Sequence, residues 1–183
     1  ACASAFAREL LQEVNTDEDS VPLVMPEPGG RKGPKPVFHE LRNMQEEAES
    51  IARDIQERRK AGAALSDIGV FCTAPFVGSA VAESLERAGI AFEWLKDAKS
   101  KQWQPGHDSV KLMTVQSCKG LQYRVAIVAG AGFLPYRSEP DDARLMYVAM
   151  TRAREQLVIS SSQPRNASAE SWWQRILVVS EFT

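Results

Sequence analysis

One polar turn in the sequence gathers side chains that can bind a phosphodiester backbone. Its text, TVQSCKG, offers hydroxyls at Thr114 and Ser117, an amide at Gln116 and an ammonium at Lys119. These are donors that proteins direct at the phosphates and sugars of nucleic acids. Gly120 can adopt a positive φ or let the main chain approach a ligand closely. A polar turn after a strand is more often only a turn, so both interpretations stay open on these residues alone.

A second candidate is Arg152, which with Arg154 lies between an apolar helical stripe and an apolar strand. A guanidinium presents a rigid fork of donors that suits phosphate, and in phosphoryl transfer such a finger neutralises charge on the transferring group. The structural alternative is that both arginines only interact with the negative end of a helix. Because ligands of open α/β sheets meet the carboxyl ends of the strands, we expect both candidate segments at that edge.

Alternating strands and helices must position these two segments. The residues 68–72, IGVFC, form a continuous apolar run, typical of a strand buried on both faces of a parallel sheet. Thr73 is expected to cap the next helix and Gly89 to end it. Strands are predicted at 37–38, 68–72, 90–95, 110–115, 125–128 and 157–160, and helices at 3–14, 43–60, 75–88, 140–153 and 171–179. This order predicts an α/β fold with a mostly parallel sheet and helices on both faces.

Composition limits the function classes. The chain has 183 residues, of which 44% are apolar and 25% charged, which is enough for one globular domain. Its net charge of −2 argues against binding nucleic acid by bulk charge, though not against a local phosphate site. No apolar run reaches the roughly 20 residues of a membrane span. Three widely spaced cysteines predict neither a disulfide framework nor a metal site, and favour a reducing, cytoplasmic compartment.

Two segments are expected to lack regular structure. Residues 15–36 are rich in proline and glycine, with an acidic front and a basic rear, and are predicted to be an irregular, solvated loop. Residues 96–109 are polar and basic and are predicted to be a short loop.

The two candidate segments resemble motifs V and VI of the UvrD/Rep family of superfamily one DNA helicases. Family motif V reads T-[hydrophobic]-H-S-[AS]-K-G-L-E-[FYW] between two strands, and residues 114–123 read TVQSCKGLQY. Family motif VI reads R-L-x-Y-V-[AG]-x-T-R-A, and residues 144–153 read RLMYVAMTRA. Two specific motifs in the family's order argue against coincidence. The resemblance implies a RecA-like (P-loop NTPase-type) three-layer domain.

The resemblance implies that the motif V turn contacts single-stranded DNA. Thr114, Gln116 and Ser117 match family positions that contact the DNA backbone, and we assign Lys119 to the same surface. Gln116 stands where the family has histidine, so it can still donate to a phosphate but carries no charge. Cys118 replaces a small residue, and we expect its size to be tolerated.

The resemblance also implies ATP with Mg²⁺, bound mainly by a first RecA-like motor domain. Arg152 matches the motif VI arginine that contacts the γ-phosphate. Gly120 and Gln122 match positions near the ribose and phosphates, although Gln122 replaces a glutamate and accepts a ribose hydroxyl proton more weakly. Arg144 and Tyr147, about one turn apart, are expected to brace the motif VI helix.

By this resemblance, residues 1–183 are the second motor domain of an ATP-dependent DNA helicase, without the large arm that many family members insert before motif V. The sequence contains no GxxxxGK[ST] loop, no DExx pair and no motif IV, and it begins with alanine. We therefore expect a piece of a longer DNA-repair protein that hydrolyses no ATP alone and binds no cofactor or metal by itself. Its expected partners are single-stranded DNA and the first motor domain, with no membrane.

Two other classes of function stay open. Gln116 and Gln122 are compatible with a non-catalytic interaction module that keeps a degenerate helicase fold. A free-standing single-strand binder would need aromatic platforms for its bases. Four tryptophans are present. Two of them, Trp172 and Trp173, lie on the expected 171–179 helix, and tryptophans on an apolar helix more often pack within the protein than bind bases.

Overall fold

The computed structural model describes residues 34–95, 104, 106–118, 120–134, 139–162, 173–174 and 177. The helix expected at 3–14 lies outside these residues. So do most of the irregular segment 15–36, of the loop 96–109 and of the helix expected at 171–179.

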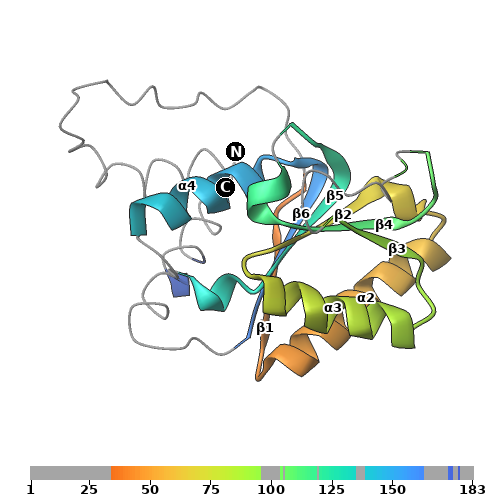
Figure 1. The fold of residues 1–183 in the computed structure, drawn as a ribbon, viewed down its shortest axis with the longest axis horizontal. Helices are drawn as coiled ribbons and strands as arrows, with labels where there is room; N and C mark the ends of the chain where they lie inside the picture. Colours follow the sequence, from red (N-terminus) through yellow and green to blue (C-terminus); the bar gives the residue numbers. More distant parts are fainter. Residues whose placement is uncertain are drawn as a thin grey trace.

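Six strands form one parallel sheet in the order β1-β6-β5-β2-β4-β3 (Figure 1). Each pair of neighbouring strands is parallel, which confirms the predicted sheet and brings all the carboxyl ends to one edge. At that edge Cys72 is level with Thr114 on one side and with Ala129 on the other. The strands are β1 Val37–Leu41, β2 Ile68–Cys72, β3 Phe92–Leu95, β4 Val110–Thr114, β5 Tyr123–Ala129 and β6 Ala153–Ser162.

Helices α2 and α3 cover one face of the sheet (Figure 1). α2 spans Met44–Lys60, and the side chain of Asn43 caps it by accepting from the N–H of Glu46 at 2.9 Å. α3 spans Pro75–Arg87 and ends two residues before Gly89, as predicted. Both helices bury the apolar stripes that their spacing predicted. The buried side chains are Ala48, Ile51, Ala52 and Ile55 of α2 and Val77, Val81 and Leu85 of α3.

Thr73 does not cap α3, contrary to the expectation. The capping position is Ala74, which makes no side-chain bond to the helix. Thr73 instead prolongs the pairing of β2 with β5: its N–H donates to the Ala129 carbonyl at 3.1 Å, and its hydroxyl donates to the Gly130 carbonyl at 2.8 Å. The Thr73 hydroxyl therefore bonds to the backbone that follows β5 and does not bond to the start of α3.

Helix α4, Glu139–Met150, covers the opposite face together with a one-turn 3-10 helix, η3, at Val115–Cys118. α4 ends three residues before the predicted boundary at 153, and β6 begins earlier and ends later than the predicted 157–160. β6 is long because it pairs with β5 on one side and β1 on the other. Its last residues, Ser160–Ser162, are buried serines that apolar patterning cannot recognise as strand.

In the part of the chain that the structure describes, none of the helices has the length and apolar character needed to cross a bilayer.

Candidate functional site

The motif V turn follows β4 at the carboxyl edge of the sheet. Residues of η3 three apart lie on the same side of a 3-10 turn, so Val115 and Cys118 are both buried in the core. Gln116 and Ser117 are partly exposed between them. The hydroxyls of Thr114 and Ser117 lie 3.2 Å apart and share a hydrogen bond. Thr114, Gln116 and Ser117 thus lie together at one turn, while Lys119 lies outside the described residues.

Buried sulfur atoms support this turn from inside. The Cys118 thiol donates to the Val115 carbonyl at 2.9 Å, which closes the 3-10 turn. The size of Cys118 is tolerated, because it is fully enclosed in the core. Cys72, at the end of β2, is also buried, and its burial and then the nearby Glu47 raise the pKa of its thiol far above the usual range. Both cysteines are free thiols with structural positions.

The other motif V candidates lie at the opposite edge. Gly120 has a φ of +81°, and a side chain built on it would meet nothing within 4 Å, so the backbone conformation alone favours glycine there. Gln122 is exposed. Tyr123, which begins β5, is level with Ala153 at the start of β6.

Arg152 lies between α4 and β6, beside this same edge. Its guanidinium donates to three neutral acceptors: the Val148 carbonyl at 2.9 Å, the Leu121 carbonyl at 3.4 Å and the Thr151 hydroxyl at 3.0 Å. Its own carbonyl accepts from the N–H of Tyr123 at 3.0 Å. Arg152 therefore joins the end of motif VI to the end of motif V.

The expectation that both segments meet the carboxyl edge is wrong for Gly120, Gln122 and Arg152. β5 and β6 are parallel to β4, so each connection that enters them must first return to the amino edge. β5 runs from Tyr123 to Ala129, which separates the two edges by about 20 Å. Thr114, which is matched to a DNA contact, therefore lies at one edge, and Gln122 and Arg152, which are matched to nucleotide contacts, adjoin the other. A single segment, residues 114–123, connects them.

The predicted bracing residues of α4 lie along its exposed and core sides. Arg144 pairs with Asp141 at 3.4 Å within the helix. Tyr147 packs against the core cluster, and its carbonyl accepts from the N–H of Thr151 at 3.0 Å. Of the two, only Tyr147 contacts the last turn of α4, from which Arg152 extends, whereas the Arg144 pair lies near the start of the helix.

Sequence reasoning missed a buried carboxylate at the carboxyl edge. Glu47 of α2 is fully buried, and its Oε1 accepts from the N–H of Gly130 and from the Ser160 hydroxyl, both at 2.7 Å. Gly130 has a φ of +80°, and a Cβ there would lie 2.6 Å from Thr73 Oγ1. Glu47 thus ties α2 to the turn after β5. Its position four residues before Ile51, within the apolar stripe, was the available signal.

An aromatic pair at the same edge was also missed. Phe76, in the first turn of α3, is 40% exposed. Its ring lies 4.9 Å from that of Phe133, centroid to centroid, at an interplanar angle of 88°. Phe133 ends the 3-10 turn Ala131–Phe133, which follows β5. Phe76 lies outside the apolar stripe of α3, which was the signal for an exposed position.

An ionic cluster joins β3 to β4 and to described residues that precede β4. Glu93 of β3 accepts from Lys111 at 3.0 Å, from His107 at 2.9 Å, from Ser109 at 3.0 Å and from the N–H of Gln104 at 2.9 Å. Partial burial raises the pKa of Glu93, but the hydrogen bonds from Gln104, Lys111, Ser109 and His107 outweigh it and lower the pKa to about 2. Lys111 is itself buried within β4, which its sequence context did not predict.

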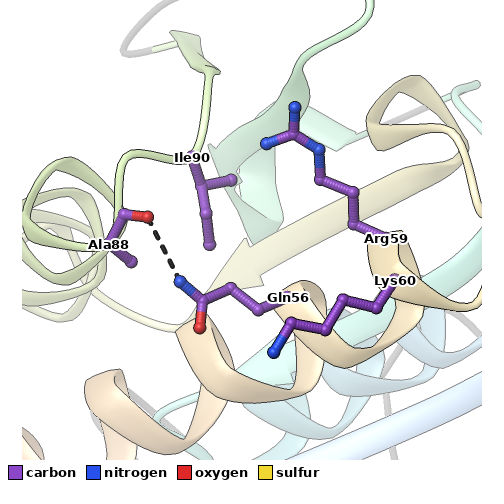
Figure 2. A pocket seen from close by; sticks show the side chains of 5 residues that line it. All are labelled: Gln56, Arg59, Lys60, Ala88 and Ile90. Carbon is purple, nitrogen blue, oxygen red and sulfur yellow. Dashed lines mark hydrogen bonds between the residues drawn. The ribbon is translucent and has the colours of Figure 1, made fainter.

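A basic groove of about 430 Å³ lies away from these residues, where the ends of α2 and α3 meet (Figure 2). It is lined by Gln56, Arg59, Lys60, Ala88 and Ile90. The amide of Gln56 donates to the Ala88 carbonyl at 3.2 Å. Cations at helix C-termini are favoured by the helix dipole, which accounts for Arg59 and Lys60 without a ligand. Across the described ranges, no three His, Cys, Asp or Glu side chains are grouped to hold a metal ion.

The parallel sheet, covered on both faces, defines a three-layer α/β domain of the RecA-like kind. Within it, residues 109–160 match the family model of the UvrD-like helicase C-terminal domain, which confirms the resemblance over the stretch that holds both motifs. Residues 109–160 are thus similar to the UvrD-like helicase C-terminal domain. No curated protein sequence matches the chain.

One solved structure with a TM-score above 0.5 agrees with the fold. The C-terminal domain of a possible DNA helicase from Lactobacillus plantarum WCFS1 aligns over 92% of both chains, with a TM-score of 0.60 and 17% identity. The arterivirus nonstructural protein 10 helicase aligns with TM-scores of 0.48 in complex with DNA and 0.49 alone, at 12% and 11% identity. Those two alignments cover 76% of this chain and 33% of the viral chain.

Proposed function

We propose that this chain is the second motor domain of an ATP-dependent DNA helicase or translocase. In this function the turn at Thr114 binds the backbone of single-stranded DNA, and Arg152 contacts the γ-phosphate of ATP held by a first motor domain. The observation that carries the proposal is the sorting of the matched residues by ligand. Thr114, matched to DNA, lies at the carboxyl edge, and Gln122 and Arg152, matched to nucleotide, adjoin the paired residues Tyr123 and Ala153 at the amino edge.

The turn at Thr114 suits a phosphate backbone. Its two hydroxyls and the Gln116 amide are partly exposed, while Val115 and Cys118 fix the turn from below. A fixed set of neutral donors can bind a single strand without an excess of basic residues. The net charge of −2 means that this chain has no such excess. Neutral donors also release few counterions, so we expect modest affinity that decreases only slightly as the salt concentration rises.

The guanidinium of Arg152 can reach a phosphate without losing its present anchors. It has five N–H donors, and three of them are engaged with Val148, Leu121 and Thr151, which leaves two. The bond to Leu121, at 3.4 Å, is the longest of the three. A γ-phosphate that attracts the guanidinium would weaken this bond first, because charged acceptors make stronger hydrogen bonds than carbonyls do.

Weakening the bond between Arg152 and the Leu121 carbonyl would affect the turn that follows β4, at residues 114–118. Leu121 is also tied to η3, because its N–H donates to the Cys118 carbonyl at 3.1 Å. Leu121 therefore contacts Arg152 on one side and the base of the DNA turn on the other. We infer two arrangements of residues 118–122, with Arg152 bound to Leu121 or to nucleotide, whose populations ATP shifts.

The test uses a longer protein in which a P-loop motor domain precedes this one. Arg152→Ala should lower DNA-stimulated ATP hydrolysis by a factor on the order of 10³ or more. Arg53→Ala, which removes an exposed arginine from α2 on the opposite face, is the matched control and should leave turnover unchanged. Equal turnover in the Arg152→Ala and wild-type proteins would refute the finger. ATP hydrolysis by this chain alone would contradict the prediction that the chain, whose sequence has no P-loop motif, hydrolyses no ATP by itself.

The second candidate is a non-catalytic module that keeps the fold and binds DNA or protein. Gln116 and Gln122 favour it, because each replaces an ionisable family residue with an amide. DNA binding that is intact, with hydrolysis that does not depend on Arg152, would support this candidate over the motor.

A further inference from the structure

The basic groove between the ends of α2 and α3 has walls that are fixed by the protein itself. Each helix is followed by a glycine with a positive φ, +93° at Gly62 and +64° at Gly89. In both places the N–H groups of the glycine and of the residue after it bond to carbonyls of the last helical turn at 3.0 Å. The Gln56 amide then joins the two ends through the Ala88 carbonyl at 3.2 Å. The groove therefore exists before any ligand binds.

Two cations of this groove have no partner within the described part of the chain. The last turn of α2 carries Arg58, Arg59 and Lys60. Arg58 pairs with Asp54 at 2.7 Å, whereas Arg59 and Lys60 are exposed and form no ion pair or side-chain hydrogen bond with any described residue. The carbonyls of this turn already accept from the backbone that follows the helix. The helix dipole favours positive charge at this end, but the donors of both side chains stay available.

One carboxylate, Asp108, lies near Arg59 without neutralising it. The pKa of Asp108 is lowered first by hydrogen bonds from Ser66 and last by the charge of Arg59. Its Oδ1 accepts from the N–H of Ser66 at 3.0 Å, and it forms no ion pair with Arg59. A ligand with its own carboxylates is therefore needed to pair the two cations.

The lining of the groove suits a ligand that is both acidic and aliphatic. Ala88 and Ile90 form one wall, and the stems of Arg59 and Lys60 place methylene groups below their charged ends. Figure 2 shows both cationic side chains extending from the end of α2 towards that wall. The volume of about 430 Å³ lies within the roughly 300–1,000 Å³ of ligand pockets. A short peptide with carboxylates on either side of an aliphatic residue combines these properties.

The position of the groove argues against the single strand as its ligand. The strands that α2 and α3 connect are parallel, so both helices end at the amino edge of the sheet. The 17 residues of α2 separate this end by about 25 Å from the carboxyl edge, where Thr114 lies. None of the residues that line the groove is aromatic, so it offers no platform for bases.

We propose that this groove binds an acidic peptide segment of a partner protein. Arg59 and Lys60 pair with its carboxylates, and Ala88 and Ile90 contact its aliphatic side chain. This inference does not rest on the proposed motor function. Exposed ion pairs are screened by salt and each contributes little, so the interaction is weak and sensitive to ionic strength.

The test is an NMR titration of the isotope-labelled 183-residue chain at low salt. The probe is the end-blocked peptide EDLDE, which has carboxylates on both sides of a leucine. The backbone amide signals of Gln56, Arg59, Lys60, Ala88 and Ile90 should shift until the site is saturated. The uncharged peptide QNLNQ should leave these signals in place. An EDLDE titration without shifts at these residues would overturn the proposal, whether or not any variant folds.

Two double variants separate the groove from general charge attraction. Arg59→Gln with Lys60→Gln should weaken EDLDE binding roughly 2- to 30-fold, the loss expected for two exposed ion pairs. Lys35→Gln with Arg53→Gln is the matched control, because it removes the same charge from exposed positions outside the groove and should leave the affinity unchanged. Equal weakening in both variants would overturn the site. So would an oligothymidine that shifts the same amide signals and displaces the peptide, because the ligand would then be nucleic acid.

Discussion

The buried Glu47 makes a sharp prediction about stability. In Glu47→Ala, the Gly130 N–H loses its acceptor inside the fold, and an unsatisfied buried donor costs about 1–3 kcal/mol. The Ser160 hydroxyl loses less, because it can turn to the Val128 carbonyl, 3.3 Å away. Removing the carboxylate also relieves a burial cost, since its Oε2 has no hydrogen-bond partner. Because the smaller loss at Ser160 and the relieved burial cost oppose each other, the net loss in the free energy of unfolding stays at about 1–3 kcal/mol.

Glu47→Gln is the matched control for this prediction. The amide keeps the volume and one oxygen that can accept from Gly130 and Ser160, but it loses the charge that strengthens both bonds. Its NH₂ group would occupy the place where Oε2 has no partner. We expect a smaller loss, about 1–2 kcal/mol.

Urea denaturation of the three proteins measures both changes, with equal slopes taken as the sign of an unchanged native state. A Glu47→Ala protein within about 0.5 kcal/mol of wild type would refute the reasoning. So would a Glu47→Gln protein that is as unstable as Glu47→Ala, because the cost would then come from the charge and not from the orphaned donor.

The remaining predictions concern acid and a buried hydroxyl. Because the pKa of Glu93 is lowered from 4.5 to about 2 in the folded state, the stability it contributes is complete above pH 4.5 and is lost as pH falls towards 2. Glu93→Gln should lack this loss, and urea midpoints that decline in parallel between pH 6 and pH 3 would contradict it. The Tyr123 hydroxyl is buried without a hydrogen-bond partner, and burial, then Cys118 and Glu93, raise its pKa to about 12. Tyr123→Phe should therefore raise stability by about 1 kcal/mol, and a lower melting temperature would argue against it.

Apolar patterning was enough to predict the central layer of the fold. The run IGVFC in β2 is buried at every position, so its sequence carries no polar signal that could mislead. The stripe of α2 is equally plain, and Asn43 marks its start by capping. These elements are determined by local residues and by burial on one sheet, which the sequence displays directly.

Other features depend on contacts between distant segments, which local patterns do not display. The buried end of β6 consists of serines, one of which is bonded to Glu47 of α2, more than a hundred residues earlier. Thr73 has the residue type of a helix cap, but the neighbouring strand end competes for its hydroxyl and wins. The partners of Glu47, Gly130 and Ser160, lie more than 80 residues further along the chain, so they could not be known before the sheet was ordered.

The candidate site was also predictable only in part from the sequence. Residue types and motif order made Thr114, Gln116, Ser117 and Arg152 candidates, whose roles stay predictions, but could not place them in the fold. Their placement follows from strand order, because a parallel connection from β4 to β5 has to pass β2 and return to the amino edge.

This geometry restricts how the two edges can influence each other. Val115, Cys118 and Tyr123 are buried, so the two ends of the connecting segment are fixed in the core. Between them, Gly120 and Gln122 are exposed, and Gly120 has no neighbour that a side chain would meet. Any movement from Arg152 towards the DNA turn must therefore be taken up around Gly120. The only described hydrogen bonds that cross this hinge are those of Leu121, to Arg152 on one side and Cys118 on the other. Under the proposed function, these two bonds would link the Arg152 guanidinium to the turn at residues 114–118 through the backbone of Leu121.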